Sequence, residues 1–145
     1  MVSILEGREE ISALELGIPP HLSGTEALAM MQAALGELPL VLHLPLNRAG
    51  EEWLSELAGL GVSALSLGAP RGSLPGPDGK RVNGRLYGPA IFPQTLAAVI
   101  EATRWGLPVI AGGGVYRKEQ GEALLEAGAW AVQLDMVLWQ VHSAG

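Results

Sequence analysis

The sequence predicts an α/β protein built from repeated strand–helix units, with about five strands in one parallel sheet. Short, nearly continuous apolar runs alternate with segments of helical periodicity, as expected for strands of a parallel sheet and the helices that cover them. The 20 glycines of the chain repeatedly mark the ends of these segments. A similar pattern also recurs in residues 11–17, 62–68 and 129–134. Such a repeat indicates one supersecondary motif used several times.

Composition limits the possible classes of protein. A chain of 145 residues that is 48% hydrophobic and 17% charged can form a single domain with a real core, here residues 1–145. The net charge of −6 and the scattered cations argue against nucleic acid as a partner. There is no cysteine, which excludes disulfides and thiolate chemistry. The start of the chain lacks the pattern of a signal peptide, and no uncharged stretch would span a membrane, so we expect a cytoplasmic protein without membrane contact.

The first unit is predicted from residues 11–17, which form a strand that ends at a glycine. Residues 19–21, Pro-Pro-His, then form a loop, because proline suits neither a helix interior nor a central strand. Ser23 and Glu26 have the spacing of a capping box, so a helix should begin there. Its inward residues are Leu28, Met31 and Leu35, and Gly36 ends it.

The second and third strands follow. Residues 38–46 are almost all apolar, which is typical of a strand buried on both faces, and His43 is the one polar residue among them. Residues 51–60 predict a helix that ends at Gly61, and residues 62–67 predict the third strand.

Residues 69–86 interrupt this rhythm. They contain three prolines, four glycines and four cations and show no apolar period, so we expect a long loop inserted after a strand. Loops of this length are usually functional or mobile. Pro93 is well placed to open the next helix, and Gly106 to end it. The expected buried face of that helix is Leu96, Val99, Ile100 and Thr103.

The fourth strand, residues 107–115, stops in three glycines. Consecutive glycines let the backbone come close to a ligand such as a phosphate. A helix over residues 117–127 and a last strand over residues 131–134 follow. Asp135 could cap a short final helix that ends near Gln140.

Five strands are too few for a closed (β/α)8 barrel, which needs eight. The chain is therefore either part of a barrel of the TIM type or an open doubly wound sheet. Either sheet would have two edges with unpaired backbone groups. We therefore expect a homo-oligomer, or a partner chain that completes the barrel.

Three motifs resemble those of the dihydroorotate dehydrogenase family. Residues 84–90, Gly-Arg-Leu-Tyr-Gly-Pro-Ala, are similar to its Gly-Gly-Leu-Ser-Gly-Pro-Ala. Residues 110–115, Ile-Ala-Gly-Gly-Gly-Val, resemble its Gly-Gly-Ile phosphate loop, and residues 131–134 resemble its last strand. From about residue 11 to residue 140, the chain looks like the C-terminal portion of that FMN-dependent barrel, in the family's order.

The resemblance implies an FMN-dependent oxidoreductase, part of a split barrel, that oxidises dihydroorotate to orotate in pyrimidine biosynthesis. His43 stands where the family has a flavin-contacting Lys, and Asp135-Met136 where it has Gly-Thr. The backbone of the glycines would hold the flavin phosphate. The cofactor-binding positions that the resemblance implies are His43, Gly88, Gly112, Gly113, Gly114, Asp135 and Met136.

Other positions depart from the family. Gly17 and Ala69 stand where it has asparagines, and the loop of its catalytic Cys or Ser reads Pro19-Pro20-His21 here. No catalytic base can be identified in the chain. A second hypothesis is therefore a non-catalytic relative that acts as an interaction or scaffold subunit. A third is a different (β/α) enzyme that uses the glycine loop for another phosphate ligand.

Each candidate also has a purely structural interpretation. The three glycines could form a tight strand-to-helix turn, and His43 could be a buried neutral histidine or a polar residue at a strand end. Asp135 is favoured as a helix cap. Three cations of the long loop could hold an anionic substrate or simply face solvent; they are Lys80, Arg81 and Arg85. No metal site is expected, because the spacing around His21 and His142 does not suggest one.

Overall fold

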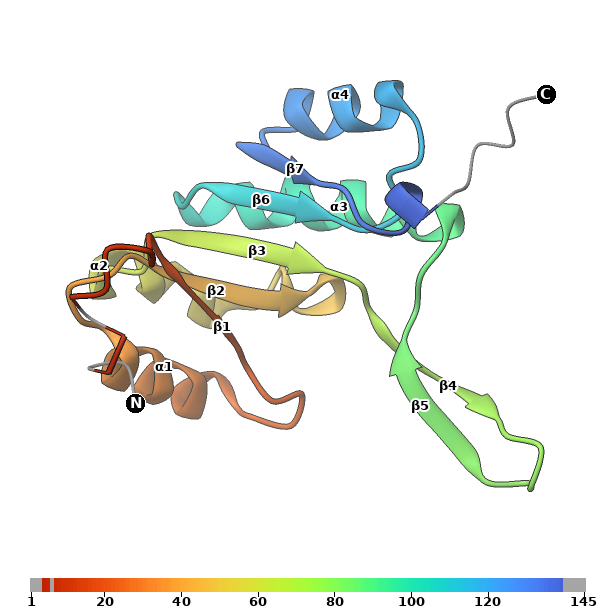
Figure 1. The fold of residues 1–145 in the computed structure, drawn as a ribbon, viewed down its shortest axis with the longest axis horizontal. Helices are drawn as coiled ribbons and strands as arrows, with labels where there is room; N and C mark the ends of the chain where they lie inside the picture. The colour runs from red at the N-terminus through yellow and green to blue at the C-terminus, as the bar shows by residue number, and fades with distance from the viewer. Residues whose placement is uncertain (1–3, 6, 140–145) are drawn as a thin grey trace.

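The computed structural model describes residues 4–5 and 7–139; Gln140 and His142 lie outside this part. Its centre is a five-stranded sheet in which every neighbouring pair is parallel (Figure 1). The predicted parallel β/α architecture is confirmed. The strands, in their order across the sheet, are β1 (Leu14–Gly17), β2 (Leu40–Pro45), β3 (Ala64–Gly68), β6 (Val109–Gly112) and β7 (Ala131–Gln133).

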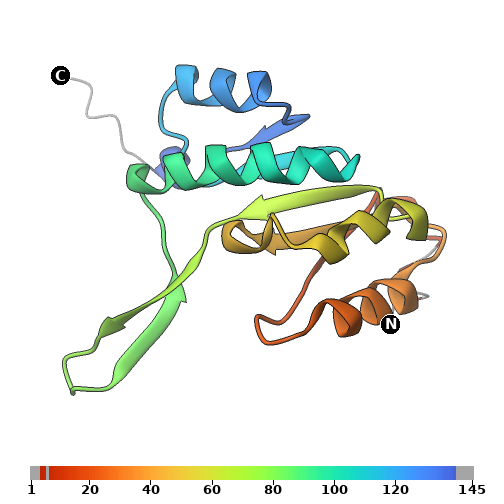
Figure 2. The ribbon, with the colours of Figure 1, turned by 180° about the vertical axis from the view of Figure 1, so that it is seen from behind.

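Helices lie against one face of this sheet. Figure 2 shows α2 and α3 in front of the strands, with α1 below them next to η3, and α4 packs beside α3 and β7. The α-helices are α1 (Gly24–Ala34), α2 (Leu57–Leu60), α3 (Phe92–Ala102) and α4 (Lys118–Glu126). Short 3-10 turns are η2 (Leu46–Arg48), η3 (Glu52–Glu56), η4 (Pro89–Ile91), η5 (Thr103–Trp105) and η6 (Met136–Trp139). None of the described helices is long and apolar enough to cross a membrane.

The strand order distinguishes the two predicted architectures. A doubly wound sheet reverses its order at a switch point and carries helices on both faces. Here the order runs in one direction from β1 to β7. Right-handed connections then place successive helices on the same side. The arrangement is that of a partial barrel.

The other face of the sheet, which we call the open face, carries the alternate residues of each strand. In β2 the fully buried residues Leu40, Leu42 and Leu44 face the helices, so His43 lies on the open face. Strand β2 is thus buried on only one face, contrary to the expectation. The register assigns to the open face Glu15, Gly17, Val41, His43, Pro45, Ala64, Ser66, Gly68, Ile110, Gly112, Ala131 and Gln133.

Helix α1 begins where the capping box predicts. The Ser23 hydroxyl accepts a hydrogen bond from the Glu26 backbone N–H, and the Ser23 N–H donates to the Glu26 carboxylate. The predicted helix over residues 51–60 is different: η3 precedes the single α-helical turn of α2, and Gly61 ends it with a φ of 98°. A segment this short, with Gly59 inside it, gains little from α-helical propagation.

Helix α3 is rotated relative to the prediction. Pro93 lies in its first turn, as expected, and Val99 is buried. Ile100, however, is 52% exposed, so its place on the buried face was wrong. The other residues that face the sheet are small, namely Thr95, Ala98 and Ala102. Their size lets the helix lie close to the glycines that follow β6.

Residues 69–86 form a β-hairpin and not an irregular loop. Strands β4 (Arg71–Pro75) and β5 (Arg81–Arg85) pair antiparallel, and Figure 1 shows the hairpin extending away from the sheet beyond the end of β3. Leu74 and Val82 are 64% and 57% exposed, so the segment packs no apolar face and shows no apolar period. The Pro-Asp-Gly sequence at residues 77–79 was the available turn signal.

Candidate functional site

The predicted site residues gather at the carboxyl edge of the sheet, where ligands of parallel α/β proteins usually bind. His43 lies near the end of β2, the three glycines end β6, and Asp135 follows β7. Two hollows lie at this edge. The glycine hollow is lined by Tyr87, Gly88, Gly113, Gly114, Val115, Tyr116, Gln133, Asp135 and Met136. The arginine hollow is lined by Gly17, Ile18, Pro19, Pro20, His43, Pro45, Ala69, Arg71 and Arg85.

The glycines after β6 form a turn that packs tightly on α3. Gly113 and Gly114 have φ angles of 116° and 73°, which other residues rarely adopt. A Cβ at Gly114 would overlap the backbone of Phe92. The hydroxyl of Thr95, which is fully buried, donates a 2.8 Å hydrogen bond to the Gly113 carbonyl. Packing alone therefore requires glycine here, as the structural interpretation expected.

The same turn also offers free donors. The carboxamide oxygen of Gln120 accepts hydrogen bonds from the N–H groups of Tyr116 and Arg117, at 2.8 and 3.0 Å. In the part of the chain that is described, the N–H groups of Gly113 and Gly114 donate to no protein acceptor. These two groups are therefore available to bind an anion, as is the N–H of Val115, which also has no protein acceptor among the described residues.

The glycine hollow brings together five of the seven cofactor positions that the resemblance implies: Gly88, Gly113, Gly114, Asp135 and Met136. Its volume is about 10 Å³, which is the room that one water molecule needs. A flavin phosphate would fit only if exposed side chains moved aside; Tyr87 is 48% and Met136 40% exposed. The Asp135 carboxylate would repel that phosphate.

Gly112 and His43, the other two positions, lie on the open face outside the glycine hollow. A Cβ at Gly112 would come within 2.9 Å of the Leu67 carbonyl oxygen. His43 is two strands away, because β3 lies between β2 and β6. With strands about 4.8 Å apart and a rise of about 3.3 Å per residue, the Cα atoms of Gly112 and His43 lie about 12 Å from each other.

His43 is held by its neighbours on the open face. Its ring fills the space that Gly68 leaves, since a Cβ there would overlap the imidazole. Nδ1 lies 3.4 Å from the Ser66 hydroxyl and 3.4 Å from the Glu15 carboxylate. Burial lowers the pKa of His43 below its ordinary value of about 6.5, Glu15 opposes this shift, and the Arg85 charge adds to it. The imidazole is therefore mostly neutral at pH 7.

The arginine hollow has a volume of about 290 Å³. Its two cations stand opposite each other at the base of the hairpin, where Arg71 and Arg85 are register partners. Neither has an ion-pair partner among the described residues. Sequence patterns alone group Arg85 with Lys80 and Arg81 and do not single out Arg71. In the structure, Lys80 and Arg81 line a different hollow beside the hairpin turn. The hairpin register was the missing information.

Positions that depart from the dihydroorotate dehydrogenase pattern also meet in the arginine hollow. Gly17, His43 and Ala69 come from three neighbouring strands or their ends, and the Pro19-Pro20 loop closes one side. The hollow therefore lies where the resemblance places the family's functional side chains.

A buried cluster behind this loop was not predicted. Arg48, only 7% exposed, donates from Nε and Nη2 to the two carboxylate oxygens of Glu51, both at 2.7 Å. Its Nη2 also donates to the Leu22 carbonyl at 3.1 Å, and its guanidinium lies over the Trp53 ring. Arg48 lowers the pKa of Glu51. The cluster fixes the loop after β1 to the end of β2 and so supports one wall of the arginine hollow.

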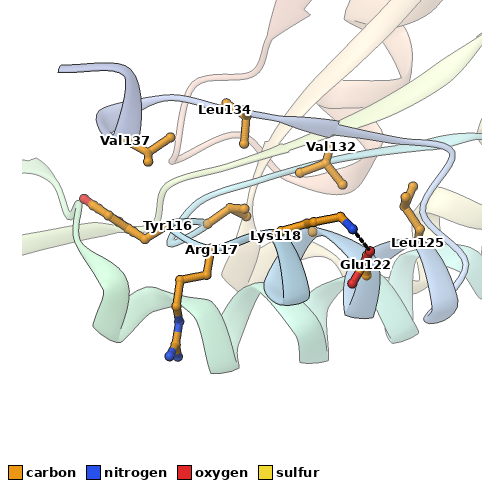
Figure 3. Close-up of a pocket in the computed structure, with 10 residues that line it drawn as sticks. Tyr116, Arg117, Lys118, Glu122, Leu125, Val132, Leu134 and Val137 are labelled. Atoms are coloured by element: carbon orange, nitrogen blue, oxygen red, sulfur yellow. Dashed lines mark ion pairs between the residues drawn. The ribbon is translucent and has the colours of Figure 1, made fainter. Parts of the chain in front are cut away.

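A third hollow, the apolar groove, lies between α4 and β7 (Figure 3). Its volume is about 460 Å³, and Lys118 pairs with Glu122 over 3.1 Å at its side. The apolar side chains that line it are Val115, Leu125, Val132, Leu134 and Val137. Trp130, 79% exposed, lies at the same sheet edge, so this edge carries much of the exposed apolar surface.

Comparison of the sequence with protein-family models and with curated proteins found no match. The likeness to dihydroorotate dehydrogenase therefore rests on the three motifs and on their place in the fold.

Proposed function

We propose that this chain is one part of a split, cytoplasmic oxidoreductase similar to dihydroorotate dehydrogenase, which binds FMN and a dihydroorotate-like substrate. The observation that carries the proposal is that the family-like positions gather at one edge of a partial barrel. Gly112, which leads into the glycine turn, and His43 are about 12 Å apart on the open face. An extended ligand with a phosphate at one end and a ring at the other can span this distance.

In this proposal the glycine turn and His43 have separate roles. The N–H groups of Gly113 and Gly114 would bind the phosphate, after Tyr87 and Met136 move from the glycine hollow. Bound FMN supplies a hydride acceptor. The neutral imidazole of His43, oriented by Glu15 and Ser66, would border the ring and substrate. The proton acceptor would come from the chain that supplies the missing strands.

The test is FMN uptake by the whole chain. Purified protein is mixed with FMN, excess FMN is removed, and the visible absorbance is measured. We expect retained flavin in the wild type and its loss in Gly113→Ala. Gly106→Ala is the control, since Gly106 also has a positive φ, 73°, and lies away from the site with open space around it. A wild type that retains no FMN, or a Gly106→Ala variant that loses it equally, would contradict the proposal.

A non-catalytic interaction subunit is the second candidate. The small glycine hollow and the exposed apolar edge at β7 favour it. The two candidates predict different effects of adding a partner chain. A partner chain that provides the missing strands should strengthen FMN binding and add dihydroorotate oxidation in the first case, and should only form a complex in the second.

A further inference from the structure

The arginine hollow contains two cations that the chain itself does not neutralise. Arg71 and Arg85 face each other across the hairpin, and each lacks an ion-pair partner in the described residues. By contrast, Lys80 of the same hairpin pairs with Asp78 at 3.7 Å. Guanidinium groups bind carboxylates and phosphates through two parallel hydrogen bonds. Two such groups at one hollow match a ligand with two negative charges.

The other groups around the hollow are mainly apolar or neutral. Ile18, Pro19, Pro20, Pro45 and Ala69 line it, and they suit the flat or aliphatic body of a small molecule.

Two more titratable groups lie nearby. The neutral imidazole of His43 provides a hydrogen-bonding edge. Glu15 is the nearby acid, but its carboxylate is directed to His43 Nδ1 at 3.4 Å and does not line the hollow. The local charge is therefore positive, although the chain carries a net charge of −6.

We propose that the arginine hollow binds a small dianion, either a dicarboxylate or a phosphate monoester on a ring-sized body. The ligand's two charges would pair with Arg71 and Arg85, and its body would lie against the prolines. This inference rests on the proposed function only if the arginine hollow is also the substrate site of the proposed oxidoreductase. In that case the substrate carries one more charge than dihydroorotate, which has a single carboxylate.

The test measures binding of four probes to the full chain by calorimetry at pH 7.5: phthalate, phenyl phosphate, benzoate and neutral benzamide. We expect at least one dianion to bind about tenfold or more tightly than benzoate, and benzamide to bind weakest, because each charged hydrogen-bond pair adds about a factor of ten. The tighter of the two dianions identifies the ligand chemistry. Equal affinity for benzoate and both dianions, or no binding of any anion, would overturn the proposal.

Variants locate the site. Arg71→Gln and Arg85→Gln should each weaken dianion binding about tenfold and reduce the preference over benzoate. Arg81→Gln is the matched control, because Arg81 is an exposed arginine of the same hairpin that does not line the hollow. It should change the affinity less than twofold. An equal loss in Arg81→Gln would show a diffuse charge effect and refute the site.

Orotate separates this proposal from the proposed function. Weak orotate binding beside tight dianion binding supports the dianion site, whatever the result of the FMN test. Orotate that binds more tightly than both dianions would overturn the dianion inference and support the dihydroorotate-like substrate.

Discussion

Replacing Thr95 with valine tests whether α3 fixes the glycine turn. Valine has nearly the same shape, so the change removes one hydroxyl without creating a large cavity. Thr95 is fully buried, and its Oγ1 donates to the Gly113 carbonyl at 2.8 Å. Loss of the donor leaves that carbonyl without this partner in a part-buried site, which costs about 1–3 kcal/mol. For a chain of this size, each kcal/mol lowers Tm by about 2–4 °C.

The assay is urea unfolding followed by circular dichroism, with Thr103→Val as the control. Thr103 makes a similar bond, from Oγ1 to the Ile100 carbonyl at 3.0 Å, but this bond is exposed to solvent. Water replaces that bond, so the control should lose less than about 0.5 kcal/mol. The reasoning is refuted if Thr95→Val is as stable as the wild type, or if both variants lose the same amount.

Three further predictions concern the neighbouring groups. The pKa of His43 is lowered in the folded chain, so the unfolded chain binds the proton more tightly and stability should fall as the pH drops through about 6.5. His43→Asn should reduce this dependence of the urea midpoint on pH between pH 8 and pH 5. An equal effect of His21→Asn, at an exposed position, would contradict the prediction. Arg48→Met should cost about 2 kcal/mol in urea unfolding, because it removes two charged hydrogen bonds to Glu51 and one to the Leu22 carbonyl. An unchanged midpoint would show that these bonds contribute nothing. Gly68→Ala should cost about 1–3 kcal/mol because the new methyl group overlaps the His43 ring, while Gly84→Ala, which has open space, tests whether glycine loss alone explains the result.

The sequence predicts most reliably what is decided by neighbouring residues. The Ser23–Glu26 capping box involves a spacing of three, so its two hydrogen bonds could be expected before any tertiary contact was known. The positions of Gly61 and Gly106 at helix ends follow from the left-handed conformation that each adopts. The five parallel strands follow from the repeated apolar runs.

What depends on distant contacts could not be read in this way. Ile100 fits the helical period of a buried face, but the close approach of α3 to the glycine turn rotates the helix and exposes it. Arg71 belongs to the arginine hollow only because it pairs with Arg85 across the hairpin. The burial of Arg48 likewise depends on Leu22, 26 residues away. Local patterns contain no information about these partners.

The open face also restricts what the proposed partner chain could contribute. On its central strand, β3, the residues are small or polar, namely Ala64, Ser66 and Gly68, and the ring of His43 lies over Gly68. The larger apolar side chains are Val41 and Ile110 on the two neighbouring strands. Such a surface offers little apolar area to a partner. The apolar groove between α4 and β7 offers more, through Val132 and Leu134 among others. A partner should therefore gain most of its binding energy at the β7 edge and leave the open face for a ligand.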